Sequence, residues 1–563
     1  MGQLLGLSRC VPCAAGRKVA PSSDFSPEGR VTSSMPSPLL RTKSPDRLLR
    51  EAEAPERKLK RALGALDLTA LGVGATIGAG IFALTGTAAA GQQVATAGAL
   101  DTPLLGLVLG QVIAGRPAAG PAIMLSFVLV AVTCAFAALA YSELASMIPV
   151  AGSAYTYAYA TLGEIFAWII GWDLILEYAV GNIAVASSWS GYFVKLLWSL
   201  LHLKLPLWAV TDAKTAGELV ARGAQDPSVL APYSSAALPR LFGHAIALNV
   251  PAFLVVALLT WILVRGIRES AAFNTGAVIL KTAIVIFFVA FGAFYVNPAN
   301  WHPFAPNGAA GVMSGAAIVF FAFIGFDAVS TAAEEAKNPQ RDMPIGILAS
   351  LAICAVLYVA VSGVLTGMTS YTRFVDDSAA IATAVEVTHK PWVEAVVSAG
   401  ALAGMTSVLL VFQLGQPRIF MSMARDGLLP GFFARIHPKH RTPHVTTILT
   451  GALVGIPALF TDIGWAADLT NIGTFFAFVL VCGGVIVLRR TAPDRPRPFR
   501  SPFVPVFPLL GIALCLGLML SLPLLTWIRF FVWMGLGLLV YGLYGRHHST
   551  MRECESGVLP ECS

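Results

Sequence analysis

Long apolar runs restrict the fold of this sequence more than any other feature. Twelve runs of about 18 or more apolar residues recur along the 563 residues. A run of that length crosses the hydrocarbon core of a bilayer as one helix. Only 12% of the residues are charged, whereas ordinary soluble domains carry about 25%. The chain is therefore expected to be an all-α polytopic membrane protein with twelve transmembrane helices.

The third and eighth runs are longer than one straight crossing requires. They are expected to tilt or to continue into a helix along the membrane surface. The twelve expected spans are residues 66–90, 121–147, 155–198, 246–265, 271–296, 311–332, 345–369, 393–424, 444–462, 466–489, 503–527 and 530–546.

Lys and Arg residues are unevenly distributed over the loops. With the N-terminus in the cytoplasm, the cytoplasmic loops hold fourteen Lys and Arg residues, and the external loops hold eight, four of them in the long connection 199–245. Because basic loops favour the cytoplasm, both termini are expected there. The formal charge of +7 then reflects orientation in the lipid membrane, and no nucleic acid binding is expected.

Polar tails flank the apolar region. Residues 1–60 are rich in Pro, Ser and Arg, which is typical of a disordered cytoplasmic tail. Within it, 51–61 favours an amphipathic helix, either on the membrane surface or simply solvated. Residues 61–490 are expected to form a ten-helix core, 491–546 helices 11 and 12, and 547–563 a cytoplasmic tail. The eight cysteines are scattered and imply no disulfide framework.

A glycine-rich stretch interrupts the first apolar run. Residues 72–82 read Gly-Val-Gly-Ala-Thr-Ile-Gly-Ala-Gly-Ile-Phe, and each glycine costs a helix interior about 1 kcal/mol relative to alanine. Unwound backbone persists in a membrane only where it is buried in protein or lines a cavity. Glycines also let two helices pack closely. This stretch alone leaves both interpretations open.

The sixth run contains a comparable interruption, in which Gly325 and Asp327 stand among aromatic residues. Interruptions five spans apart are typical of two inverted repeats of five helices, whose half-helix ends face one site in the middle of the membrane. N-terminal helix ends attract a carboxylate, and C-terminal ends attract an ammonium group. The arrangement therefore favours a zwitterionic amino acid as ligand.

Two ionisable residues lie deep within apolar runs. Lys281 is far from both ends of the fifth run, so a functional role is favoured over a side chain that reaches back to the membrane surface. Glu177 lies one helical turn after Asp173 in the third run. We expect a carboxylate here to pair with Lys281 or take part in proton movement, and a helix-packing hydrogen bond is an equal alternative.

Several long motifs resemble the amino acid–polyamine–organocation superfamily. They are residues 72–82 and 321–344, and also 141–157 and 418–430, which are similar to the cationic amino acid transporter branch and its bacterial relatives. The resemblance runs from about residue 41 to residue 546. It implies the fold of the sodium-coupled leucine transporter, whose first ten helices form two inverted repeats with helices 1 and 6 broken.

The resemblance also implies a substrate site. Backbone N–H groups near 77–80 would bind the carboxylate, and free carbonyl groups of the sixth helix would accept the ammonium. Lys281 matches a lysine that takes the place of a sodium ion in bacterial relatives, which implies proton coupling or a fixed charge, and Glu177 is a second candidate for proton coupling. The implied substrate-binding residues are Thr76, Ile77, Gly78, Ala79, Gly80, Phe320, Phe321, Ala322, Ile324 and Met405.

The implied function is secondary active transport of L-amino acids, mostly neutral ones, across the plasma membrane, coupled to protons and without a metal or cofactor. A cationic amino acid or polyamine exchanger and a non-transporting amino acid sensor remain open as alternatives. An enzyme is not expected, because Ser153 and Ser187 have no buried His partner and no span carries ligands at metal spacing. A channel is not favoured either, because no repeated filter or charge ring is present.

Residues 1–34 precede the resemblance and carry no periodic apolar face. A chain that begins at Met35 is therefore expected to insert into the membrane and to transport as well as the full chain does. Expression of both chains, followed by membrane fractionation and uptake of labelled amino acid, tests this expectation. Loss of insertion or uptake in the shorter chain would show that the segment is needed.

Overall fold

The computed structural model describes residues 41–53, 61–92, 98–113, 115–150, 152–224, 227–235, 237–241, 244–265, 271–375, 377–438 and 442–555. Most of these residues are helical, and the strands are only two or three residues long. The expected N-terminal tail lies largely outside the described residues, except for 41–53, where a helix covers Pro45–Glu53. Most of the expected C-terminal tail, from residue 556 on, lies outside them too.

Eight helical segments in the described residues are long and apolar enough to cross a membrane, and a bent helix pair makes a ninth. Three shorter apolar helices accompany them. The eight are α5 (Ile123–Met147), α7 (Glu164–Leu201), α10 (Ala271–Gly292), the segment that starts with α11 (Gly308–Val319), α12 (Pro339–Met368), α14 (Pro391–Arg425), α16 (Ile463–Thr491) and α18 (Leu524–Val540). The bent pair is α2 (Ala65–Thr76) with the segment Gly80–Ala90, which ends in α3 (Thr85–Ala90). The shorter helices are α9 (Val250–Arg265), α15 (His444–Ala458) and α17 (Val506–Leu520).

The remaining elements are short. The helices are α1 (Pro45–Glu53), α4 (Leu104–Val108), α6 (Ser153–Thr161), α8 (Ala213–Gly223), α13 (Ala380–Val385), α19 (Arg546–His548) and α20 (Thr550–Glu555). Strand β1 (Leu205–Pro206) pairs in parallel with β2 (Tyr233–Ser235), and β3 (Arg240–Leu241) pairs antiparallel with β4 (His244–Ala245). All four strands belong to the connection between α7 and α9, which also carries α8.

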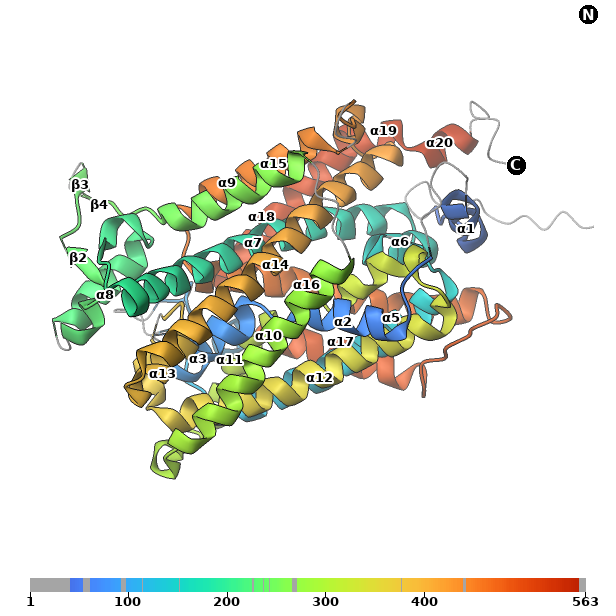
Figure 1. Ribbon diagram of the computed structural model, residues 1–563. Coiled ribbons are helices and arrows are strands. Elements are labelled where there is room, and N and C mark those ends of the chain that lie inside the picture. Colours follow the sequence, from blue (N-terminus) through green and yellow to red (C-terminus); the bar gives the residue numbers. More distant parts are fainter. Residues whose placement is uncertain are drawn as a thin grey trace, which may run out of the picture. The chain divides into compact units, whose positions relative to one another are not determined.

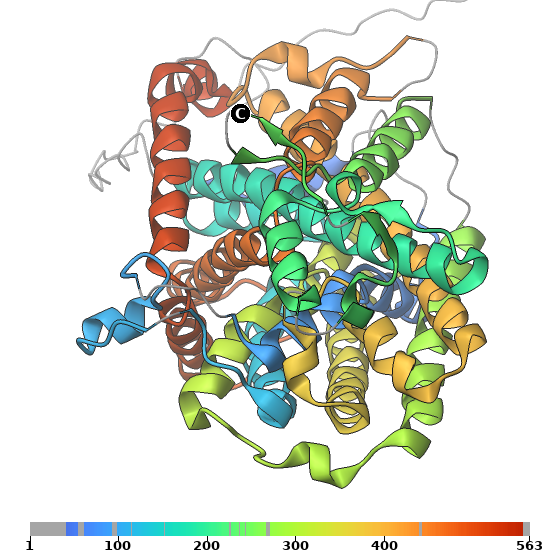
Figure 2. The same cartoon turned by 90° about the vertical axis from the view of Figure 1, so that its left-hand side faces the viewer.

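The long helices lie side by side, and α7 passes through the middle of the bundle (Figure 1). Seen along the helices, α7 is surrounded by others (Figure 2), and it packs mainly against α14 and α16. One end of the bundle carries α1, α19 and α20, and the other carries α8 and the strands (Figure 1). We call these ends the tail-side face and the loop-side face.

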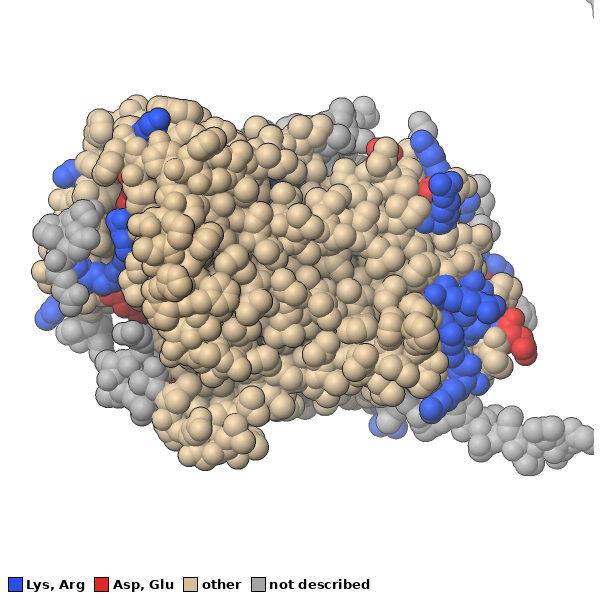
Figure 3. Space-filling view, turned by 90° about the horizontal axis from the view of Figure 1, so that it is seen from below, with Lys and Arg blue, Asp and Glu red and all other residues tan. Residues whose placement is uncertain are grey.

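Charged side chains gather at these two ends. Between them, one face of the bundle shows a wide band with almost no charged residue, and many Lys and Arg side chains lie at the tail-side end (Figure 3). An uncharged band around a helical bundle matches the hydrocarbon core of a bilayer. The chain is therefore an integral membrane protein, as the composition predicted.

Three of the expected spans have different boundaries in the structure. The run 155–198 is divided into α6 and α7, because Gly163 has a φ of +109° between them and such a conformation ends a helix. Helix α7 itself has 38 residues, so it is about 57 Å long and extends beyond the hydrocarbon core. The last two spans are divided near Pro523, several residues before the expected boundary.

A buried ion pair holds the tail-side ends of α5 and α16 together. The Glu143 carboxylate accepts hydrogen bonds from Nε and Nη2 of Arg489 at 2.9 and 2.7 Å, and from the Ser501 N–H at 2.8 Å. Glu143 is almost fully buried. By contrast, Asp46 pairs with Arg495 at 2.8 Å while its side chain remains 70% exposed.

We expect Glu143→Gln to destabilise the protein by about 3 kcal/mol, because it leaves a partly buried guanidinium without its bidentate partner. The matched control is Asp46→Asn, which breaks an exposed pair and is expected to change stability by less than about 1 kcal/mol. Melting temperatures of the two purified variants in the same detergent test this difference. Equal melting temperatures would contradict the structural role of Glu143.

Candidate functional site

The first membrane helix is broken where the glycines lie. Helix α2 ends at Thr76, and Ile77 is extended with φ −73° and ψ 101°. The chain resumes as a short π-helix, η1 (Gly80–Leu84), and continues as α3. The two halves are bent by 47°. A helix that ends and restarts inside the membrane exposes carbonyl groups at one end and N–H groups at the other.

A second break lies in the segment that follows α11. This helix continues as a short 3₁₀ turn, η7 (Phe320–Phe323), after which Ile324 is extended. Gly325 has a φ of +121°, a conformation that residues with a Cβ rarely adopt. The chain then runs on as η8 (Asp327–Glu335). Both interruptions that the sequence predicted are therefore present.

The two breaks are in direct contact. A Cβ added to Gly80 would lie 2.3 Å from the Ala322 Cα, and one added to Gly325 would lie 2.8 Å from the backbone of Ala75. Backbone atoms cannot move aside as the tip of a flexible side chain can. Each break therefore needs a glycine at the point where it touches the other.

A small cavity of about 10 Å³ lies beside this contact. A space of that size holds about one water molecule, so an amino acid fits only after the surrounding helices move apart. Its lining residues come from both breaks and from the facing sides of α7 and α14. They are Ala75, Thr76, Gly78, Ala79, Gly80, Val185, Phe321, Ile324, Val408 and Phe412.

Six of the ten residues expected at the site line this cavity: Thr76, Gly78, Ala79, Gly80, Phe321 and Ile324. The other four do not. Phe320 turns away and stacks on Phe475 of α16 at 3.8 Å between ring centroids, and Ala322 lies against Gly80. Ile77 and Met405 are fully buried without lining the cavity.

Four lining residues were not expected from the sequence: Ala75, Val185, Val408 and Phe412. Val408 and Phe412 follow Met405 on α14 by three and seven residues, so all three side chains lie near one face of this helix. Helical periodicity counted from Met405 therefore offered a signal for Val408 and Phe412. No comparable pattern in the apolar run distinguishes Val185 from its neighbours.

Lys281 is fully buried on α10 and binds the broken helix itself. Its Nζ donates hydrogen bonds to the Gly74 carbonyl and to Ser407 Oγ, the latter at 2.9 Å. The Gly74 carbonyl lies in the last turn of α2, where the helix dipole favours a positive charge. The ammonium therefore occupies the position of a cation at a helix C-terminus.

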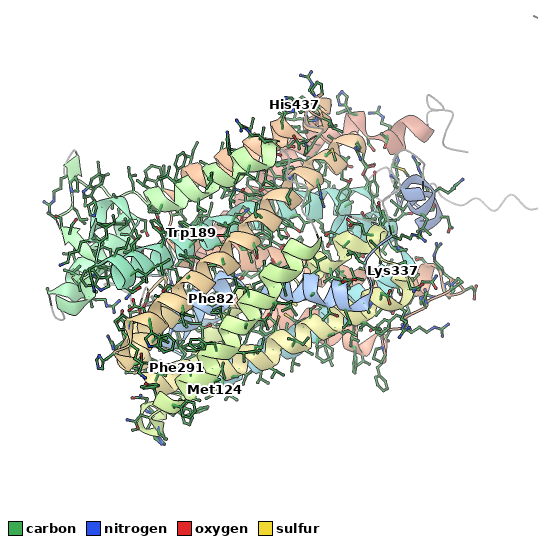
Figure 4. All side chains as sticks on the ribbon, in the orientation of Figure 1. Phe82, Met124, Trp189, Phe291, Lys337 and His437 are labelled. Carbon is green, nitrogen blue, oxygen red and sulfur yellow. The ribbon has the colours of Figure 1, made fainter. Side chains whose placement is uncertain are left out.

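Tyrosine hydroxyls satisfy two further carbonyl groups near the break. Tyr358 of α12 donates to the Thr76 carbonyl at 2.9 Å, and Tyr192 of α7 donates to the Phe82 carbonyl at 2.7 Å. Phe82 lies near the middle of the bundle, between its two charged ends (Figure 4). Unwound backbone at this depth needs such internal partners, because lipid supplies none.

Glu177 does not pair with Lys281 in the structure: no ion pair among the described residues includes that lysine. Glu177 is buried on α7, one helical turn after the buried Asp173. Neither oxygen of Asp173 has a hydrogen-bond partner within the described part of the chain.

A membrane protein with two broken helices that meet at a buried cavity has the architecture of a secondary transporter. The sequence comparisons give the family. The model of the amino acid permease family matches residues 63–540, so this chain belongs to the amino acid permease family.

Relatives of the chain include bacterial and plant transporters. The branched-chain amino acid permease BcaP of Bacillus subtilis is 44% identical over 503 residues, which are 89% of this chain and 97% of that protein. The methylthioribose transporter of the same organism is 42% identical with the same coverage. Cationic amino acid transporter 9, chloroplastic, of Arabidopsis thaliana is 33% identical over 87% of this chain and 89% of that protein.

Alanine substitutions at Gly78 and Gly80 distinguish a glycine needed for helix packing from a glycine needed for substrate binding. Gly80→Ala is expected to destabilise the protein by about 1–3 kcal/mol, because its Cβ meets backbone. In Gly78→Ala the new Cβ lies 3.1 Å from Cγ2 of the Val408 side chain, which can shift slightly to make room. The melting temperature of Gly78→Ala should therefore fall much less than that of Gly80→Ala. The new methyl occupies the cavity, however, and should weaken binding of L-leucine.

Melting curves of both variants, with and without saturating L-leucine, test these expectations. We expect a lowered melting temperature for Gly80→Ala, and a nearly unchanged one with a reduced leucine-induced shift for Gly78→Ala. An equal loss of stability in both variants would mean that Gly78 is also a packing glycine.

Proposed function

We propose that this protein is a secondary active transporter that moves L-amino acids across the plasma membrane by alternating access. The observation that carries this proposal is the contact between the two helix breaks beside one buried cavity. Helix ends of opposite polarity converge there, which suits a ligand with one carboxylate and one ammonium group. The relatives compared above are likewise a permease and two transporters.

Within this proposal, all twelve apolar segments cross the membrane, and the first ten form two inverted repeats of five. The order of the breaks supports the repeats, because they fall in the first and sixth segments. The tail-side face is the cytoplasmic one, since many basic side chains gather there (Figure 3). Alternating access then opens the cavity first toward the loop-side face and afterwards toward the tail-side face.

Backbone groups provide the recognition of the α-amino acid. The first N–H groups of the half-helix after the break, near Gly78–Gly80, bind the carboxylate, because they lack acceptors within the helix. Carbonyl groups at residues 320–324 accept the ammonium, and the Phe321 ring covers the bound substrate. Val185, Val408 and Phe412 add apolar walls to the cavity, which favours neutral apolar side chains over cationic ones.

Lys281 couples transport to protons. Its ammonium binds the Gly74 carbonyl and thereby holds the first half of the broken helix against α10. Loss of the proton removes the charge from the helix end, so the half-helix can move. Protonation from one side of the membrane and release to the other would then drive the cycle, with Glu177 as a further proton carrier.

Uptake of L-leucine into proteoliposomes tests the coupling. We expect an inward pH gradient to raise accumulation by up to about tenfold per pH unit for one proton per substrate. Replacing sodium with choline should have no effect. Lys281→Met should abolish the response to pH, whereas the control Lys337→Met, at an exposed tail-side position (Figure 4), should retain it.

Strict dependence on sodium would contradict proton coupling. Uptake or exchange that responds little to pH would show instead that Lys281 stays charged throughout the cycle. Binding of leucine without any uptake would favour the amino acid sensor.

A further inference from the structure

A second cavity in the described residues lies away from the helix breaks. It has a volume of about 400 Å³ and is formed by α7, α8, the loop before α13, and the start of α16. The connection between α7 and α9, which carries α8, lies over the loop-side end of the bundle (Figure 2). A cavity of this size is within the usual range for small-molecule sites.

The two cavities follow one another along α7. Val185 lines the small cavity, whereas Ser187 and Gly191 line the large one. Six residues of an α-helix span about 9 Å. Because each residue turns an α-helix by about 100°, Ser187 and Gly191 point away from Val185. The large cavity therefore lies on another face of α7 and nearer to its loop-side end.

Six charged side chains of both signs line the large cavity. They are Lys195, Arg222, Arg373, Asp212, Asp377 and Glu386. Lys195 and Glu386 form an ion pair, so these two charges largely satisfy each other. The four other side chains decide what the cavity can bind.

Arg222 and Arg373 each have guanidinium N–H groups that are not all bound to a carboxylate of the protein. Arg222 donates to the main-chain carbonyls of Arg373, at 3.0 Å, and Val375, which leaves its charge unbalanced by these partners. Arg373 approaches Glu386 only at 3.5 Å, and its side chain is 40% exposed. Since a guanidinium has five N–H donors, both arginines can still bind a ligand carboxylate.

The two aspartates retain acceptor capacity. Asp212 accepts the N–H groups of Lys214 and Thr215 at 3.0 Å through one oxygen, Oδ1, at the start of α8. Asp377 likewise accepts the Ala379 N–H at 2.8 Å through Oδ1. A carboxylate offers about four lone-pair sites, so each can also accept from an ammonium group.

We propose that this cavity, at the loop-side end of α7, is a second binding site for a free α-amino acid, separate from the small cavity at the helix breaks. The ligand carboxylate binds Arg373 and Arg222, and its ammonium binds Asp377 and Asp212. This proposal rests on the proposed function, because the ligand is the transported substrate. The long connection that carries α8 supplies Asp212 and Arg222, and so forms part of the site.

Equilibrium binding of radiolabelled L-leucine to the purified full-length protein tests this site. We expect two leucines per chain at saturation in the unaltered protein, and one in Arg373→Gln. Leu219→Trp, which fills the cavity without removing a charge, should also bind one. Arg240→Gln alters an exposed arginine of the same connection that does not line the cavity, and it should still bind two.

Melting temperatures identify any variant that fails to fold, and proteoliposome uptake is measured in parallel. One leucine per unaltered chain, unchanged in Arg373→Gln and Leu219→Trp while uptake proceeds, would overturn the second site alone. No binding and no uptake of any L-amino acid would overturn the proposed function as well.

Discussion

A broken helix inside a membrane is possible only if the protein itself supplies partners for the exposed backbone groups. Here three different helices supply them. Lys281 of α10 binds the Gly74 carbonyl, Tyr358 of α12 binds that of Thr76, and Tyr192 of α7 binds that of Phe82. The position of the break, and with it the cavity, therefore depends on donors that lie far away in the sequence.

The parts of the fold that could be predicted are those that depend on short stretches of sequence. The length of an apolar run, the cost of several glycines within one run, and a glycine with an acidic residue in another run are properties of the sequence itself. They predict the long membrane helices and both breaks. Which face of a helix meets the cavity depends on packing between helices. For that reason the sequence does not indicate that the Phe320 ring stacks on Phe475, or that Val408 and Phe412 line the cavity.

The contacts of buried charges and of glycines also depend on packing between helices and cannot be predicted from the sequence alone. The position of Lys281 within its apolar run predicts that it is buried. Its acceptor is a main-chain carbonyl, which residue spacing does not reveal, whereas the sequence offers Glu177 as a partner. The glycines had two open interpretations, and the structure assigns them differently. A Cβ at Gly74 would lie 2.5 Å from Val278, and one at Gly80 would meet backbone, whereas one at Gly78 would meet only the tip of Val408.

The contact between the two breaks also limits how the specificity of the site can change. Gly80 and Gly325 must remain glycines, because each touches the backbone of the opposite break. Side chains at Val185, Val408 and Phe412 line the same cavity from α7 and α14 without taking part in that contact. If the cavity binds the substrate as proposed, changes of substrate range are therefore expected at these two helices, while the backbone of the broken segments stays the same.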